Sequence, residues 1–119
     1  MTRMENQELL ERVIASFDNN DSETLISLVS EDFEWEILGE QHIKGKENLR
    51  KMFAEMDKPV KMLGSTKVLR IFDGNNAACN GVVTMQNENG ETNEHFYCDL
   101  YELQGGRLRK MTTYMVRKT

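Results

Sequence analysis

Residues 93–116 read NEHFYCDLYELQGGRLRKMTTYMV. Two runs that alternate apolar or aromatic residues with polar ones flank Gly105–Gly106, which predicts two antiparallel strands joined by a tight turn. If Gln104–Gly106 is a three-residue loop, Leu103 faces Arg107. That register sets Asp99 opposite Met111, Tyr97 opposite Thr113, and His95 opposite Met115.

A second hairpin is predicted upstream, where Asn89–Gly90 follows a strand over Ala77–Gln86. A loop of two or four residues makes odd positions of the later strand face even positions of the earlier one. Gly81 could seat a bulge and change this count. We therefore expect the sheet face that contains Asp99 to include, from the earlier strand, Ala78, Asn80, Val82 and Thr84.

The first half of the chain has helical periodicity. Leu9, Leu10, Val13, Ile14 and Phe17 recur on one side of a first helix. A second helix is expected through Leu25–Val29, and a third from Leu49 until Pro59 ends it. The alternation of residues 33–37 predicts an early strand, 39–45 a polar loop, and 68–72 a further strand. The expected fold class is α+β, with three N-terminal helices packed on a curved antiparallel sheet.

Length and composition limit the possible functions. The 119 residues fit a single domain spanning 1–119, and the formal charge of -5 argues against nucleic acid as a partner. No apolar run approaches a membrane span, and the N-terminus lacks an apolar signal core, so we expect a cytoplasmic protein without a membrane partner. Two cysteines give no disulfide framework or zinc site, and no His or carboxylate pattern predicts a metal.

The predicted sheet has two different faces. The face with Asp99 mixes Met, Val and aromatic side chains with a few polar groups, which is typical of a pocket for a small organic ligand, apolar or of mixed polarity. The opposite face is also apolar, although the helices can cover only one side. We therefore expect a homodimer that associates through this sheet face. It carries Phe96, Cys98, Leu100, Thr112, Tyr114 and Val116.

The chain resembles the SnoaL-like, ketosteroid-isomerase-like branch of the nuclear transport factor 2-like superfamily. The resemblance implies a cone-shaped pocket between sheet and helices and usually a homodimer; it specifies fold better than activity. It rests on Phe17-Asp18-Asn19-Asn20-Asp21, Glu31-Asp32-Phe33-Glu34-Trp35, Gly39 through Gly45-Lys46-Glu47-Asn48-Leu49, and Asp99-Leu100-Tyr101 through Gly106-Arg107-Leu108.

Ketosteroid isomerases use a carboxylate base, a tyrosine and a protonated aspartate. By resemblance, Asp99 takes the position of that aspartate. The base position falls on Ile37 and the tyrosine position near Val13, and neither side chain can transfer a proton. Steroid isomerisation by that mechanism is therefore not expected.

Asp99 is the leading candidate for a catalytic group. Burial among Met and Tyr side chains would raise the pKa of its carboxyl and let it donate a hydrogen bond or exchange a proton. The alternative is a structural aspartate bound to Tyr97, Asn80 or a backbone amide. His95 is a weaker candidate for a general base, and its alternative is a solvated histidine on a strand. His42, in the polar loop, is expected on the surface.

The remaining candidates would form the pocket wall or the core. The leading hypothesis is a cofactor-free isomerase, cyclase or hydrolase that uses Asp99. The alternatives are a non-catalytic dimeric interaction module and a protein that sequesters an apolar metabolite. The sequence does not identify the ligand or the reaction. The candidate pocket residues are Trp35, Ile37, Phe53, Asn80, Val82, Tyr97, Tyr101, Met111, Thr113 and Met115.

Overall fold

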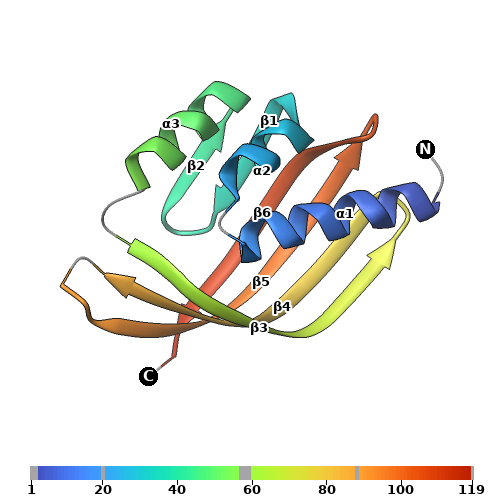
Figure 1. Cartoon of the computed structure of the whole chain (residues 1–119). Helices are drawn as coiled ribbons and strands as arrows, with labels where there is room; N and C mark the ends of the chain where they lie inside the picture. Colours follow the sequence, from blue (N-terminus) through green and yellow to red (C-terminus); the bar gives the residue numbers. More distant parts are fainter. Residues whose placement is uncertain (1–2, 20, 57–59, 88, 119) are drawn as a thin grey trace.

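The structure, a computed structural model, describes residues 3–19, 21–56, 60–87 and 89–118. Helices occupy the first half of the chain and long strands the second, which confirms the α+β class (Figure 1). Within the described ranges the elements follow in the order α1 (Arg3–Asp18), α2 (Ser22–Leu28), β1 (Val29–Ile37), β2 (Gln41–Lys44), α3 (Lys46–Met56), β3 (Val60–Asp73), β4 (Asn76–Asn87), β5 (Thr92–Gln104) and β6 (Arg107–Arg117).

The strands form one curved sheet in the order β2-β1-β6-β5-β4-β3. Its two ends do not meet, so the sheet is open (Figure 1). Neighbouring strands are antiparallel except for β1 and β6, which run parallel. A parallel pair needs a long connection, and here everything between Ile37 and Arg107 supplies it. The sheet is therefore mixed, whereas the sequence predicted antiparallel pairing throughout.

The helices cover only one face of the sheet. We call this the inner face and the opposite side the outer face. Helix α1 lies across the inner face, while α2 and α3 lie near β1 and β2 (Figure 1). Strand β5 contributes Tyr101, and strand β6 contributes Met111, to the core between the helices and the inner face. Its most deeply buried members are Leu10, Val13, Ile14, Leu25, Val29, Phe33, Leu49, Leu108 and Met111.

Three elements differ in extent from the sequence prediction. Strand β1 begins at Val29, because α2 already ends at Leu28. Residues 41–44, predicted as loop, form β2 because their backbone pairs with β1, for instance Ile43 with Trp35. Strand β3 begins at Val60, well before the predicted 68–72, because it pairs along the whole of β4. Pro59, predicted to end the third helix, lies outside the described residues.

The Gly105–Gly106 turn and a register shift next to it together set the pairing of β5 with β6. Gln104 pairs with Arg107, so the loop has two residues, and both glycines have positive φ angles of 61° and 78°. That conformation suits glycine because it has no Cβ. The two-residue loop alone would place Asp99 opposite Thr112, but the register shifts by one further residue between Glu102 and Leu103, so Asp99 lies opposite Thr113 rather than Met111. The loop and this shift together displace the partners by two residues, so from Lys110 onward the predicted faces of β5 and β6 are correct although the predicted partners are wrong.

The hairpin between β4 and β5 places the side chains of β4 on the face opposite to the predicted one. Gln86 pairs with Thr92, and the Asn87 amide donates to the Glu91 carbonyl, so an odd number of residues separates the strands. An odd loop reverses the predicted parity. Cys79 therefore lies beside Asp99 on the inner face. Asn80 and Val82, predicted to face the pocket, lie on the outer face instead.

A buried amide joins α1 to the β3–β4 turn. Asn6 is 4% exposed, and its Nδ2 donates to Asn75 Oδ1 at 2.6 Å and to the Gly74 carbonyl at 3.4 Å. A buried polar group without its partner costs about 1–3 kcal/mol. The contact therefore fixes the start of α1 over the sheet.

We expect Asn6→Ala to lower the free energy of unfolding by about 1–3 kcal/mol, because Asn75 loses its buried donor. Urea denaturation followed by circular dichroism measures the change. Asn48→Ala is the control, since Asn48 also donates to a carbonyl, that of Lys44, but in an exposed position. Equal effects of the two substitutions would contradict the role given to burial.

Candidate functional site

Asp99 lies on the inner face of β5, between Cys79 of β4 and Thr113 of β6. Its side chain is half-buried, whereas Thr113 is only 3% exposed. Thr113 Oγ1 donates to Asp99 Oδ1 at 2.7 Å. The register shift between Glu102 and Leu103 makes this contact possible, because without it the two-residue turn would place Thr112 opposite Asp99.

Trp35 of β1 extends the network to a third strand. Its indole Nε1 donates to Thr113 Oγ1 at 2.9 Å. An indole nitrogen can only donate, and a hydroxyl has a single proton. Thr113 therefore accepts from Trp35 and gives its own proton to Asp99. This chain fixes Asp99 Oδ1 as an acceptor.

The second carboxylate oxygen meets Tyr101. The Tyr101 hydroxyl donates to Asp99 Oδ2 at 3.5 Å, a long contact. Tyr101 is 3% exposed, and burial followed by the charge of Asp99 raises its pKa well above the ordinary value of 10.0. Tyr101 therefore keeps its proton and remains a donor. Both oxygens of Asp99 face hydroxyl donors.

Apolar side chains surround this polar centre. The Trp35 ring meets Phe17 of α1 edge-on, with ring centroids 5.5 Å apart at 71°. Met111 is fully in the core. The other predicted wall residues on β1, α3, β5 and β6 keep some exposure although the helices cover this face; they are Trp35, Ile37, Phe53, Tyr97 and Met115.

His95 lies on the same face but at the other end of β5. It pairs with Val83 and Arg117 and is half-buried. Four residues separate it from Asp99, a distance of ~13 Å along a strand, so the two side chains do not form a pair. Its Nδ1 is buried without a hydrogen-bond partner among the described residues. The geometry does not join His95 to the Asp99 network.

Metal-binding clusters and membrane-spanning helices have no candidate in the part of the chain that the structure describes. No group of three or more His, Cys, Asp or Glu side chains is placed to hold a metal ion there. The described helices include none with the length and apolar character needed to cross a bilayer. His42, predicted in a loop, lies on β2 with its Nε2 3.9 Å from a carboxylate oxygen of Glu34, and its side chain is exposed.

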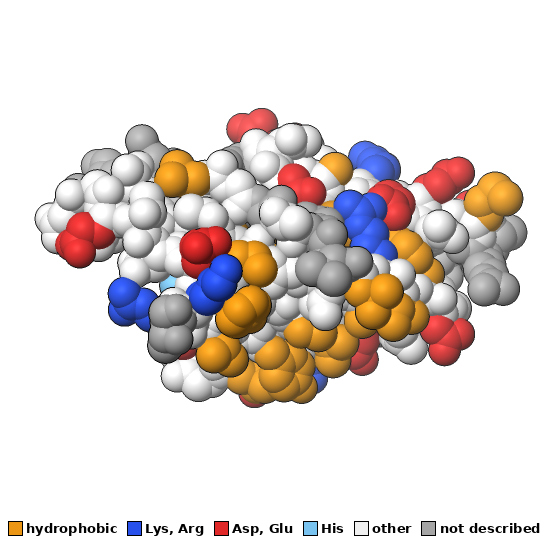
Figure 2. Space-filling view, turned by 90° about the horizontal axis from the view of Figure 1, so that it is seen from below, with side chains coloured by type: hydrophobic (Ala, Val, Ile, Leu, Met, Phe, Trp, Pro, Cys, Tyr) orange, Lys and Arg blue, Asp and Glu red, His pale blue; other side chains and the backbone are white. Residues whose placement is uncertain are grey.

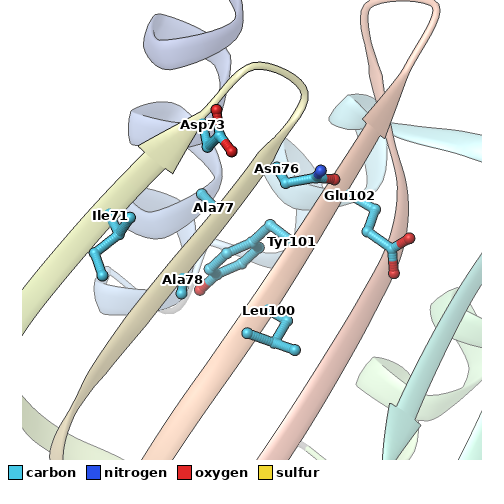
Figure 3. A pocket seen from close by; sticks show the side chains of 8 residues that line it. All are labelled: Ile71, Asp73, Asn76, Ala77, Ala78, Leu100, Tyr101 and Glu102. Carbon is cyan, nitrogen blue, oxygen red and sulfur yellow. The ribbon is translucent and has the colours of Figure 1, made fainter.

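The outer face has a hollow that the sequence did not indicate. It has a volume of about 380 Å³ and lies over Ala78 of β4, between Ile71 of β3 and Leu100 of β5 (Figure 3). The small Ala78 side chain leaves the space that its larger neighbours enclose. Asp73, Asn76 and Glu102 form its polar edge towards the β3–β4 turn.

Large apolar side chains are exposed around this hollow. Figure 2, which views the molecule from below the sheet, shows hydrophobic side chains gathered together with charged ones around them. The six largest contributors are between 36% and 65% exposed, and they are Leu69, Ile71, Phe96, Leu100, Tyr114 and Val116. The predicted apolar outer face is therefore present and uncovered in one copy of the chain.

Thr113→Val keeps the shape of the side chain but removes the hydroxyl that links Trp35 to Asp99. We expect a loss of about 2 kcal/mol in the free energy of unfolding, because a buried donor and a carboxylate oxygen both lose their partner. The chain has one Trp. Its single indole N–H signal in a ¹⁵N NMR spectrum should shift. Thr112→Val, on the outer face, is the control and should leave that signal in place.

Tyr101 should make stability sensitive to alkaline pH. The unfolded chain releases this proton near pH 10 while the folded chain retains it, so stability is complete below pH 10 and falls as pH rises above it. The slope should reach ~1.4 kcal/mol per pH unit from this group. Tyr101→Phe should remove that slope in denaturation curves from pH 9 to 11. Tyr114→Phe, exposed on the outer face, should keep the wild-type profile.

Comparison with solved structures supports the fold. An NTF2-like protein (nuclear transport factor 2-like) from Burkholderia xenovorans LB400 superposes with a TM-score of 0.82 and 18% identity, covering 98% of this chain and 92% of the other. A Mycobacterium tuberculosis epoxide hydrolase of the LEH-like type gives 0.81 and 17%, covering 95% and 84%. A protein with a ketosteroid isomerase-like fold from Catenulispora acidiphila, solved with trimethylamine, gives 0.76 and 14%, covering 90% and 84%.

At these identities the structural similarity establishes the fold and leaves the activity open. No curated protein matches the sequence. The model of the SnoaL-like domain family matches residues 10–111. That span begins within α1 and includes α2, α3 and the strands that carry Trp35 and Asp99. The chain therefore belongs to the SnoaL-like domain family.

Proposed function

We propose that the chain binds a small organic molecule between the helices and the inner face of the sheet, with Asp99 contacting its polar group. The observation that carries this proposal is the chain of hydrogen bonds from Trp35 through Thr113 to Asp99 Oδ1, at 2.9 and 2.7 Å. It fixes a carboxylate among half-buried apolar side chains. A binding site of this kind is mostly apolar with few oriented polar groups.

The geometry supports a specific role for Asp99. Oδ1 accepts from the Thr113 hydroxyl at 2.7 Å, and Oδ2 accepts from the Tyr101 hydroxyl at 3.5 Å. Oδ2 is the oxygen that contacts the ligand in this proposal, because its bond to a hydroxyl is the longer of these two. Both surrounding hydroxyls donate, so Asp99 acts as an acceptor or general base in this arrangement, rather than as the protonated donor inferred from burial.

The reaction class that fits is a cofactor-free isomerisation, cyclisation or hydrolysis. In each, Asp99 Oδ2 would take a proton from a ligand C–H or O–H, or from water, and return it at another position. No oxidant or reductant is needed for such a step. His95 lies too far from Asp99 to share the proton directly.

A non-catalytic, dimeric binding module is the second candidate. The observation that favours it is the exposed apolar outer face, where six side chains expose on the order of 500 Å² together, near the largest patches found on monomers. Two copies that pack these faces together would each cover the other. Dimerisation is compatible with either function, because the outer face is separated from Asp99 by the sheet.

The Asp99 assignment can be tested with two matched probes. 2-Naphthol carries an O–H that Oδ2 can accept, and 2-methoxynaphthalene has the same ring without a donor. We expect Asp99→Asn to weaken 2-naphthol binding by about tenfold or more while changing 2-methoxynaphthalene little, because a hydrogen bond to a charged acceptor contributes about 1.5–3 kcal/mol. Isothermal titration calorimetry measures both.

Asp73→Asn is the matched control, since Asp73 is an exposed acid on the other side of the sheet. It should leave both affinities unchanged. Equal changes for the two probes, or no change for either, would contradict the role of Asp99. Loss of 2-naphthol binding in the Asp73→Asn variant alone would assign it to the outer hollow instead.

A further inference from the structure

The inner face of the sheet is unevenly covered. On β4, Cys79 and Val83 are only 2% and 5% exposed. The inner-face residues of β5 from Asp99 to His95 keep partial exposure, and helix α1 does not extend over the end of the sheet where β6 finishes (Figure 1). The accessible part of this face therefore follows β5 and β6. We call it the inner strip, and it consists of the cross-strand pairs Asp99–Thr113, Tyr97–Met115 and His95–Arg117.

The inner strip has a polar group at each end. Four residues separate Asp99 from His95, which is ~13 Å along a strand, and the Tyr97 ring and the Met115 side chain lie between them. The predicted register placed Met115 opposite His95. The observed pairing places Arg117 there instead, so a cation lies beside His95 at the end of the strip away from Asp99.

Arg117 is a cation without a carboxylate partner among the described residues. Its Nη2 donates to Asn93 Oδ1 at 2.6 Å, and the nearby Glu94 is 4.0 Å from Lys118 Nζ instead. The neutral amide of Asn93 holds the guanidinium without neutralising its charge. The remaining N–H groups of Arg117 can therefore bind an anion, and a planar guanidinium matches a carboxylate through two parallel hydrogen bonds.

His95 adds a second donor at this end. Its Nδ1 is buried without a hydrogen-bond partner among the described residues, although the ring as a whole is half-buried. A neutral imidazole has one N–H and one bare nitrogen. A buried N–H without an acceptor is rarer in proteins than an acceptor without a donor, so we assign the bare nitrogen to Nδ1. The proton then lies on Nε2, at the edge of the ring away from the backbone.

We propose that the ligand of the inner-face site is a hydroxy acid, with its O–H on Asp99 and its carboxylate bound by Arg117 and His95. This inference rests on the inner-face site proposed above and names the chemistry of its ligand. An acceptor at one end of the strip and donors at the other fix the direction in which the molecule lies. Its two polar groups are separated by roughly 7–13 Å, since hydrogen bonds of ~2.8 Å at both ends share the ~13 Å between the residues.

Three naphthalenes with one ring system test the carboxylate. 6-Hydroxy-2-naphthoic acid carries both polar groups, 6-hydroxy-2-naphthamide replaces the carboxylate by a neutral amide, and 2-naphthol has the hydroxyl alone. Near pH 7 we expect wild type to bind the acid about tenfold or more tightly than the amide, because hydrogen bonds between charged groups are stronger than those to a neutral acceptor. Isothermal titration calorimetry measures the three affinities.

Two variants assign that preference to its residues. Arg117→Gln should abolish the preference for the acid, because it removes the charge and keeps an amide donor. His95→Phe should weaken binding of the acid about fivefold or more and change 2-naphthol little. Lys118→Gln is the matched control, since Lys118 is the next residue and has the same charge, but its Nζ lies 5.7 Å from the ring centroid of Phe96 on the outer face. It should keep the preference of wild type.

The position of the His95 proton can be observed without a ligand. The chain has two histidines, so His42→Gln leaves His95 alone in a long-range ¹H–¹⁵N spectrum of the imidazole nitrogens. We expect the tautomer with the proton on Nε2, and a shift of the Nε2 signal when the hydroxynaphthoic acid is added. A proton on Nδ1 would contradict the donor that we assign to Nε2.

The outcomes separate this inference from the proposed function. If none of the three naphthalenes binds, or if Asp99→Asn does not weaken 2-naphthol, the inner-face site itself is rejected. Binding of 2-naphthol that depends on Asp99, with equal affinities for the acid and the amide, would retain the site and reject the hydroxy acid. A preference for the acid that survives Arg117→Gln, or that Lys118→Gln removes equally, would also overturn the proposal.

Discussion

The sheet has two apolar faces, and the helices can cover only one of them. The rest of the structure depends on this constraint. The helices follow one another at the start of the chain and pack on the inner face, where their buried side chains meet Tyr101 and Met111. Apolar surface left in water carries a cost of about 25 cal/mol per Å². The inner face is thereby sheltered, whereas the outer face keeps its apolar side chains exposed.

The partly buried position of Asp99 determines which hydrogen bonds its carboxylate needs. A carboxylate beside apolar side chains must have its hydrogen bonds satisfied, and hydroxyls from β6 and from its own strand provide them. The indole of Trp35 orients the first of these hydroxyls from a third strand. The parallel pairing of β1 with β6 brings that indole into range, so the site depends on the longest crossover in the sheet.

Much of this architecture could be predicted from local patterns. The apolar periodicity in residues 9–17 predicts α1, and the alternation around Gly105–Gly106 predicts the faces of β5 and β6 correctly. From Lys110 onward the predicted partners were displaced by two residues, one from the loop and one from the register shift beside it, which leaves these side chains on their predicted face. The β4 prediction failed because faces depend on whether a loop is odd or even, and the Asn89–Gly90 signal does not determine that number. Asn80 and Val82 were consequently assigned to the wrong side of the sheet.

The sequence by itself determined the α+β class, the order of the elements other than β2, and the choice of Asp99 as the polar residue among apolar ones, because these follow from side-chain periodicity along a single segment. Only the tertiary structure decided that Thr113 and Trp35 bind in series to Asp99, that residues 41–44 form a strand, and that Ala78 lies below a hollow. Each of these features joins segments far apart in the chain. Their geometry depends on register and sheet order, which local periodicity does not encode.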